Sequence, residues 1–174
     1  MSAVARSRSR ALATLGAVAL AAGCGSAATP VGDPVLGQRA AGAVTIRTAV
    51  VPGVGRVLAD GAGHVLYMFP PDAKQRVSCV GACAGTWPPV AIAAGRTPRA
   101  AAGARQDYLG TLADPNTGAR IVTYHRYPLY RYAGDTEPGT ARGQALTLNG
   151  GPWYVVDVAG TPVTAPARTP AGRR

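Results

Sequence analysis

The sequence has few of the residues that carry catalytic chemistry in proteins. It contains two histidines and eight acidic residues, and its 18 basic residues include a single lysine, Lys74. It has no nucleophile elbow, no Gly-rich phosphate loop and no helical metalloprotease motif. Nothing near Asp72 or Asp135 is expected to separate their pKa values, as a pair of glycosidase carboxylates requires. We therefore expect a protein that is not an enzyme and that has no cofactor.

The sequence also lacks a block of basic residues interleaved with aromatics. Apart from the two ends of the chain, its arginines occur singly, so a nucleic-acid partner is not expected. The excess of arginine over lysine is partly compositional, since the chain is also rich in alanine. The positive charge nevertheless suits an anionic membrane or wall polymer.

No apolar run is long enough to cross a bilayer. The longest, residues 11–22, is too short to span and follows Arg6, Arg8 and Arg10, which is typical of a signal peptide at residues 1–23. The segment that ends at Cys24 resembles the lipobox of bacterial lipoproteins. That resemblance implies a cleaved chain whose Cys24 carries acyl groups such as palmitate and anchors it at the outer face of the cytoplasmic membrane. The alternative is an ordinary secretory signal followed by an unmodified cysteine.

Helical periodicity is missing from the rest of the chain. Residues 24–43 are rich in Gly, Ala, Pro and Ser and are predicted to be a flexible tether after the lipidated cysteine. Residues 44–159 alternate short β-branched runs with Gly and Pro turns, which predicts a mainly β domain built from antiparallel strands. Residues 91–107 are expected to form a surface loop, and residues 160–174 a disordered tail.

Cys79 and Cys83 are the two cysteines that remain after Cys24. In an exported protein their default state is a disulfide with each other. The alternative is a metal-binding or redox-linked protein, with His64, His125 and Met68 as the other soft or borderline ligands. The spacing of the cysteines is wider than in most zinc sites, and the histidines lie far apart in the chain, so no metal is expected.

One short pattern occurs twice. Tyr-x-aromatic-x-x-Asp appears first in residues 67–72 and again in residues 130–135, each time after a leucine and before a tryptophan some twenty residues on. Its members are Tyr67, Phe69, Asp72 and Trp87 in the first copy, and Tyr130, Tyr132, Asp135 and Trp153 in the second. Residues two apart on a strand share a face, so the two rings of each copy project together. The aspartate is expected to fix the turn that follows by accepting backbone N–H groups.

These residues resemble those of a bacterial family of secreted-repeat lipoproteins, named for tandem copies of this motif. The cysteine pair with residues 87–89 fits first copies of the repeat, and residues 151–156 fit second copies. The resemblance implies export, lipid anchoring and duplication into related units at about residues 55–90 and 109–158. It implies no activity.

The repeated aromatics have two interpretations. Paired rings on strands usually pack in a core. Alternatively, the six rings form an exposed platform edged by Asp72 and Asp135, which would suit a sugar or a peptide. We expect a non-catalytic binding or interaction module of the cell envelope, with a wall polymer, a glycan or an envelope protein as its partner.

Overall fold

The computed structural model describes residues 43–73 and 75–165. The predicted signal peptide, Cys24, almost all of the predicted tether and the last nine residues lie outside the described residues. The described part is mainly β, as the sequence predicts. Its elements are β1 (Thr45–Val51), β2 (Gly55–Asp60), β3 (Tyr67–Met68), η1 (Pro70–Asp72), α1 (Ala82–Thr86), β4 (Ala91–Ile92), β5 (Arg99–Ala100), η2 (Gln106–Tyr108), β6 (Leu109–Ala113), β7 (Arg120–Tyr124), β8 (Tyr127–Pro128), β9 (Thr147–Leu148), β10 (Gly151–Pro152) and β11 (Tyr154–Val155).

Each half of the domain begins with an antiparallel hairpin. β1 pairs with β2, and β6 pairs with β7. In the second hairpin the side chain of Asp114 accepts the N–H of Asn116 at 3.0 Å and the hydroxyl of Thr117 at 2.8 Å, and Gly118 follows with a φ of 72°. These bonds form an Asx turn closed by a left-handed glycine, which reverses the chain at residues 114–118.

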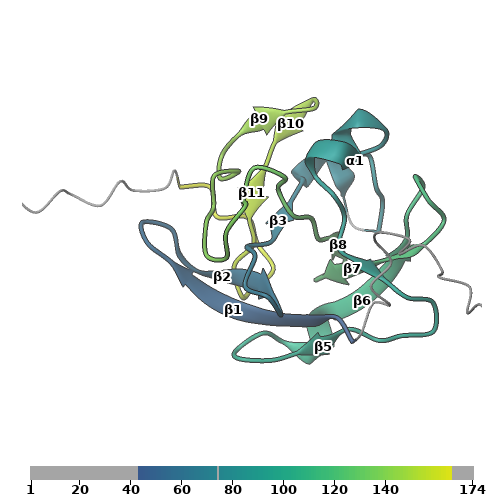
Figure 1. Cartoon of the computed structure of the whole chain (residues 1–174), viewed down its shortest axis with the longest axis horizontal. Coiled ribbons are helices and arrows are strands. Elements are labelled where there is room, and N and C mark those ends of the chain that lie inside the picture. Colours follow the sequence, from purple (N-terminus) through teal and green to yellow (C-terminus); the bar gives the residue numbers. More distant parts are fainter. Residues whose placement is uncertain (1–42, 74, 166–174) are drawn as a thin grey trace, which may run out of the picture. The chain divides into compact units, whose positions relative to one another are not determined.

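After these hairpins the two halves exchange strands (Figure 1). β3 of the first half pairs with β11 of the second, with Tyr67 opposite Val155. In return, Tyr130 of the second half bridges to Pro89 of the first. The two motif strands also bond to each other, because the N–H of Tyr67 donates to the carbonyl of Tyr130 at 2.9 Å and the reverse bond is 3.0 Å. Neither half completes its sheets without the other.

The alternation of the motif strands divides the core between their two faces. Tyr67 and Phe69 point into one cluster, and Leu66 and Met68 point into a second. The first cluster contains the rings of both motifs, both tryptophans and both cysteines; the second consists mainly of aliphatic residues, from Ile46, Leu58, Val90, Ile92, Val122, Leu129 and Val156. The expected facing of these residues is thereby confirmed.

Three expectations about secondary structure are wrong: where the C-terminal tail begins, that residues 91–107 form only a loop, and that all strands are antiparallel. The tail does not begin at residue 160, because the N–H of Val163 donates to Val155 at 3.0 Å and Gln144 binds the carbonyls of Val163 and Ala165. Residues 91–107 contain β4, β5 and the start of η2 as well as loop. β5 also pairs parallel to β1, so the sheets are not wholly antiparallel.

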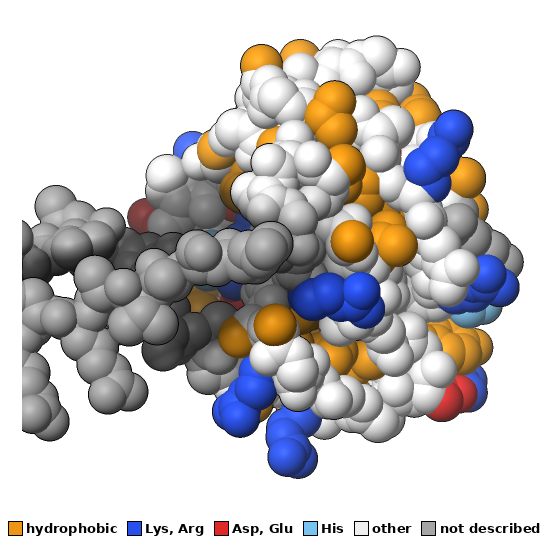
Figure 2. Space-filling view, turned by 90° about the vertical axis from the view of Figure 1, so that its right-hand side faces the viewer, with side chains coloured by type: hydrophobic (Ala, Val, Ile, Leu, Met, Phe, Trp, Pro, Cys, Tyr) orange, Lys and Arg blue, Asp and Glu red, His pale blue; other side chains and the backbone are white. Residues whose placement is uncertain are grey.

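The acidic and basic side chains of the described residues are distributed very differently. Asp60, Asp72, Asp114 and Asp135 are buried, Asp157 is half-buried, and only Asp107 and Glu137 of the described acids are exposed. The exposed arginines are Arg56, Arg76, Arg96, Arg99, Arg105, Arg120, Arg126, Arg131 and Arg142. Figure 2 shows arginines at several separate places on one face and little red beside them. The surface is therefore more cationic than the composition indicates. No helix in the described segments is long and apolar enough to cross a membrane.

Candidate functional site

The two copies of the motif are joined by crossed hydrogen bonds. The phenol of Tyr67 donates to Oδ2 of Asp135 at 2.5 Å, and the phenol of Tyr130 donates to Oδ2 of Asp72. Each tyrosine thus binds the aspartate of the other copy rather than the aspartate of its own. Burial raises the pKa of both phenols well above the usual 10.0, and the hydrogen bond to a carboxylate raises it further.

Each aspartate also fixes the loop that follows it, as predicted. Oδ1 of Asp72 accepts the N–H and the hydroxyl of Ser78, both at 2.7 Å. Oδ1 of Asp135 accepts the N–H of Arg142 at 2.8 Å. The two carboxylates therefore occupy similar surroundings, in which each ties a loop of its own copy to a ring of the other. This arrangement makes them structural acceptors.

Four rings of the motifs form a continuous stack. Trp87 and Trp153 lie parallel at the centre, with ring centroids 4.0 Å apart. Phe69 stacks on the outer side of Trp153 at 4.4 Å, and Tyr132 packs on the outer side of Trp87 at 4.4 Å with its ring tilted by 31°. Here too each tryptophan stacks on the ring of the other copy.

The stack lies in the core. Tyr67 and Tyr130 contact its tryptophans edge-on, and both phenols are fully buried, as are Trp87 and Trp153. Phe69 is 3% exposed, and only Tyr132 is partly accessible. The interpretation of these rings as an exposed platform is therefore wrong, because their faces are already covered by each other.

The two tryptophans differ in one respect. The indole N–H of Trp153 donates to the carbonyl of Leu148 at 3.1 Å, in the β9–β10 hairpin. The indole N–H of Trp87 is buried without a hydrogen-bond partner among the described residues. Before its tryptophan, the first copy has α1 and the disulfide, and the second copy has this hairpin. The two copies therefore match in their motifs but differ in the segment that joins each motif to its tryptophan.

Cys79 and Cys83 form the predicted disulfide, with Cα atoms 5.2 Å apart. The bond occupies both of the sulfur atoms that the metal or redox alternative requires. Of the other candidate ligands, Met68 and His125 line one small hollow, His125 also stacks on Tyr108 at 4.7 Å, and His64 follows the turn after β2. Within the described segments, no group of three His, Cys, Asp or Glu side chains is placed to hold a metal ion.

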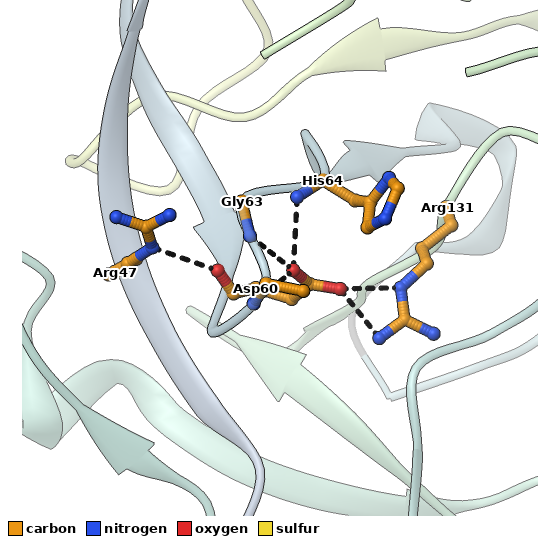
Figure 3. A network of polar contacts seen from close by, with 6 residues as sticks. Arg47, Asp60, Gly63, His64 and Arg131 are labelled. Carbon is orange, nitrogen blue, oxygen red and sulfur yellow. Dashed lines mark hydrogen bonds and ion pairs between the residues drawn. The ribbon is translucent and has the colours of Figure 1, made fainter. Parts of the chain in front are cut away.

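An ion pair joins buried Asp60 to the exposed Arg131 of the second motif (Figure 3). Oδ1 of Asp60 accepts the N–H groups of Ala62, Gly63 and His64 at 2.8–3.0 Å. Its Oδ2 accepts Nε of Arg131 at 2.7 Å and a terminal nitrogen of the same guanidinium at 2.6 Å. Asp60 is held by three backbone groups, so its position does not depend on Arg131.

This ion pair lines an open groove of about 720 Å³, here called the Asp60–Arg131 groove. Its wall combines residues from both halves: Asp60 and His64 from the first, and Arg131, Tyr132 and Asp135 from the second. In Figure 3 the imidazole of His64 extends from the turn toward Arg131. This groove could not be predicted from the sequence, because Asp60 has the sequence context of an ordinary turn residue. The available signal was Arg131, which stands where the first motif has Met68.

The other copy has a smaller, apolar hollow at the corresponding place. Counting from the tyrosines of the two motifs, Arg131 corresponds to Met68, His64 to Tyr127 and Asp60 to Thr123. Met68, His125 and Tyr127 line a hollow of about 240 Å³ that is also bounded by Pro70 and residues 160–162. Duplication therefore placed two hollows at equivalent positions, of which the larger contains an ion pair and the smaller has Met68 and Tyr127 at the positions of Arg131 and His64.

The crossed motifs agree with what comparison of the sequence with known families finds. The model of a family described as a secreted repeat of unknown function matches residues 48–91 and again residues 111–157. The chain belongs to this family. Membership makes it a secreted protein with two copies of the repeat, as the motif resemblance implies. No curated protein and no solved structure matches the chain.

The two matched segments show how the secreted repeat folds. Each segment contains a hairpin, a motif strand and a tryptophan segment, and the last two pair across to the other copy. The repeat in the sequence is therefore not a folding unit by itself. The smallest closed unit of this secreted-repeat chain is the pair.

Proposed function

We propose that this secreted-repeat protein is a non-catalytic binding module of the cell envelope, which takes its ligand in the Asp60–Arg131 groove. The observation that carries the proposal is the difference between the two equivalent hollows. With Thr123, Met68 and Tyr127, one copy closes its half of the fold without any charge at these positions. The fold therefore does not require Asp60, His64 and Arg131 at the equivalent positions of the other copy. Binding of a ligand is the simplest explanation for their presence there.

The chemistry of the groove favours a polar ligand with an apolar face, such as a wall glycan. Tyr132 is backed by Trp87 in the stack, so its ring is held in place beside the groove. Arg131 has a side chain 44% exposed, and Asp60 orients it. A fixed ring with an oriented guanidinium is a common way to bind sugars, because the ring covers a sugar face and the guanidinium donates to hydroxyl or carboxyl groups.

Converting the second motif toward the first tests the groove. Arg131→Met and Tyr132→Phe introduce the residues that stand at the equivalent positions of the first copy, so the fold should persist. Against a ligand found on an array of wall glycans and muropeptides, we expect Arg131→Met to weaken binding at least about tenfold, as loss of an oriented charged hydrogen bond does. Titration calorimetry measures the change.

Arg56→Met is the matched control, since Arg56 is exposed on β2 and does not line the groove. It should leave the affinity unchanged. An array on which nothing binds, or equal losses for Arg56→Met and Arg131→Met, would reject the groove as a binding site.

Lipid anchoring of Cys24 is the second part of the proposal. The family is secreted, and the sequence before Cys24 resembles a lipobox, which together support acylation at the outer face of the cytoplasmic membrane. Mass spectrometry of the protein extracted from membranes should find an N-terminal Cys24 carrying a diacylglycerol. Cys24→Ser should release the protein into the medium. An unmodified Cys24 in membrane-extracted protein would refute the anchor.

A further inference from the structure

A third hollow lies beside the loop that precedes β5. It has a volume of about 500 Å³, and Arg96, Thr97, Arg99 and Gln106 are among the residues that line it. No acidic side chain of the described residues lines it. The two ion pairs found in the described part of the chain join Arg105 to Asp107 and Arg131 to Asp60, so they involve neither arginine of this hollow.

The backbone around these arginines is held in place. The side-chain amide of Gln106 donates to the carbonyl of Pro98 at 3.1 Å and accepts the N–H of Ala100 at 2.8 Å. The N–H of Arg99 donates to the carbonyl of Val44 at 2.9 Å, where β5 meets β1. Pro98 is buried between the two arginines. The hollow is therefore part of the folded domain and does not depend on a free loop.

The distribution of charge explains why this place is attractive to anions. The buried aspartates Asp60, Asp72, Asp114 and Asp135 are occupied as acceptors of internal hydrogen bonds. Of the exposed arginines, only Arg131 is paired with one of these buried aspartates in the described part of the chain. A guanidinium can bind a phosphate through two parallel N–H bonds, which a lysine ammonium cannot do. Two arginines that form no ion pair within the described residues lie beside this hollow, so its chemistry suits phosphate groups.

We infer that the Arg96–Arg99 hollow binds phosphodiester groups. Two envelope components carry this chemistry: anionic wall polymers and the headgroups of anionic phospholipids. The hollow is a site separate from the Asp60–Arg131 groove, and a groove that bound nothing would leave the inference standing.

The test uses the full chain with Cys24→Ser, so that no acyl group contributes to membrane binding. One arm titrates soluble poly(glycerol phosphate), and the other measures cosedimentation with phosphatidylglycerol vesicles against phosphatidylcholine vesicles, both at low salt. Arg96→Gln/Arg99→Gln should weaken binding about tenfold, since each exposed charge contact is modest and two are removed. Arg56→Gln/Arg142→Gln is the matched control, because it removes the same charge from positions that do not line the hollow.

Loss of polymer binding in the Arg96/Arg99 variant alone supports the site with a wall polymer as its source. Loss confined to the phosphatidylglycerol vesicles supports it with a lipid source. Equal weakening by both double variants would mean that only net charge matters, and would overturn the site. Absence of binding in both arms would overturn it as well. Arg131→Met should not change either result, which separates this test from that of the groove.

Discussion

Raising the pH above 10 should destabilise this protein steeply. Burial and the crossed hydrogen bonds raise the pKa of Tyr67 and of Tyr130 above the ordinary value of 10.0, to which both return when the chain unfolds. Below pH 10 both phenols are protonated in either state, so their contribution to stability is fully present. Above it the unfolded chain loses two protons that the folded chain keeps. The free energy of unfolding should then fall by about 3 kcal/mol per pH unit.

Guanidinium unfolding at pH 8 to 12 measures this slope, and absorbance at 295 nm follows the phenolates. Of the seven tyrosines, Tyr67 and Tyr130 should ionise only as the protein unfolds, and Tyr124, whose pKa burial also raises, should ionise later than the exposed ones. The double variant Tyr67→Phe/Tyr130→Phe should lose most of the pH dependence, although it is less stable at neutral pH. If both phenols titrate near pH 10 in protein that is still folded, the crossed bonds described above do not exist in solution.

Asp72→Ala should lower the free energy of unfolding by about 4 kcal/mol. The substitution leaves the fully buried phenol of Tyr130 without an acceptor and removes the two bonds from Ser78. Each buried donor that loses its partner costs about 1–3 kcal/mol. Chemical denaturation at pH 7 gives the value.

Asp157→Ala is the control, since Asp157 also accepts a backbone N–H and a hydroxyl, both from Thr161, but is half-buried. Water can replace its bonds, so the cost should be about 1 kcal/mol. In a double-mutant cycle, Asp72→Ala should cost about 1–2 kcal/mol less when Tyr130 is already phenylalanine. Strict additivity would show that the crossed pair contributes nothing as a pair.

The residues that matter most were visible in the sequence, but their partners were not. Tyr67 and Asp72 lie in one motif, and an aspartate that ends a strand is expected to act locally. The structure confirms the local bond to Ser78 and adds the bond to Tyr130 of the other copy. Because both copies contain the same residues, a tyrosine–aspartate pair within one motif and a pair between motifs have the same sequence signature.

The groove shows a different limit. Asp60 and Arg131 are 71 residues apart and belong to different copies, so no local pattern connects them. Arg131 was noticeable only as a departure from Met68. Comparison of the two hollows connects them, since the hollow of the other copy has no charged side chain at the positions of Asp60 and Arg131.

The end of the domain was misplaced for a related reason. Residues 160–165 have the Pro, Thr and Ala composition of a disordered segment, yet Val163 pairs with Val155, and Gln144 binds two of their carbonyls. Composition describes how much apolar surface a segment can bury by itself. It does not describe hydrogen bonds that a neighbouring side chain offers to its backbone.

By itself the sequence determined the duplication, the β-rich character, the two faces of each motif strand and the disulfide, because each depends on residue type and short spacing. Only the tertiary structure decided that the halves exchange their tryptophan segments, that five of the six rings are buried while Tyr132 stays partly accessible, and that one of two equivalent hollows contains an ion pair. The exchange and the burial of the rings depend on which copy supplies the partner of each motif strand. That choice is made by the geometry of the assembled pair, since residues within a single copy cannot distinguish the two.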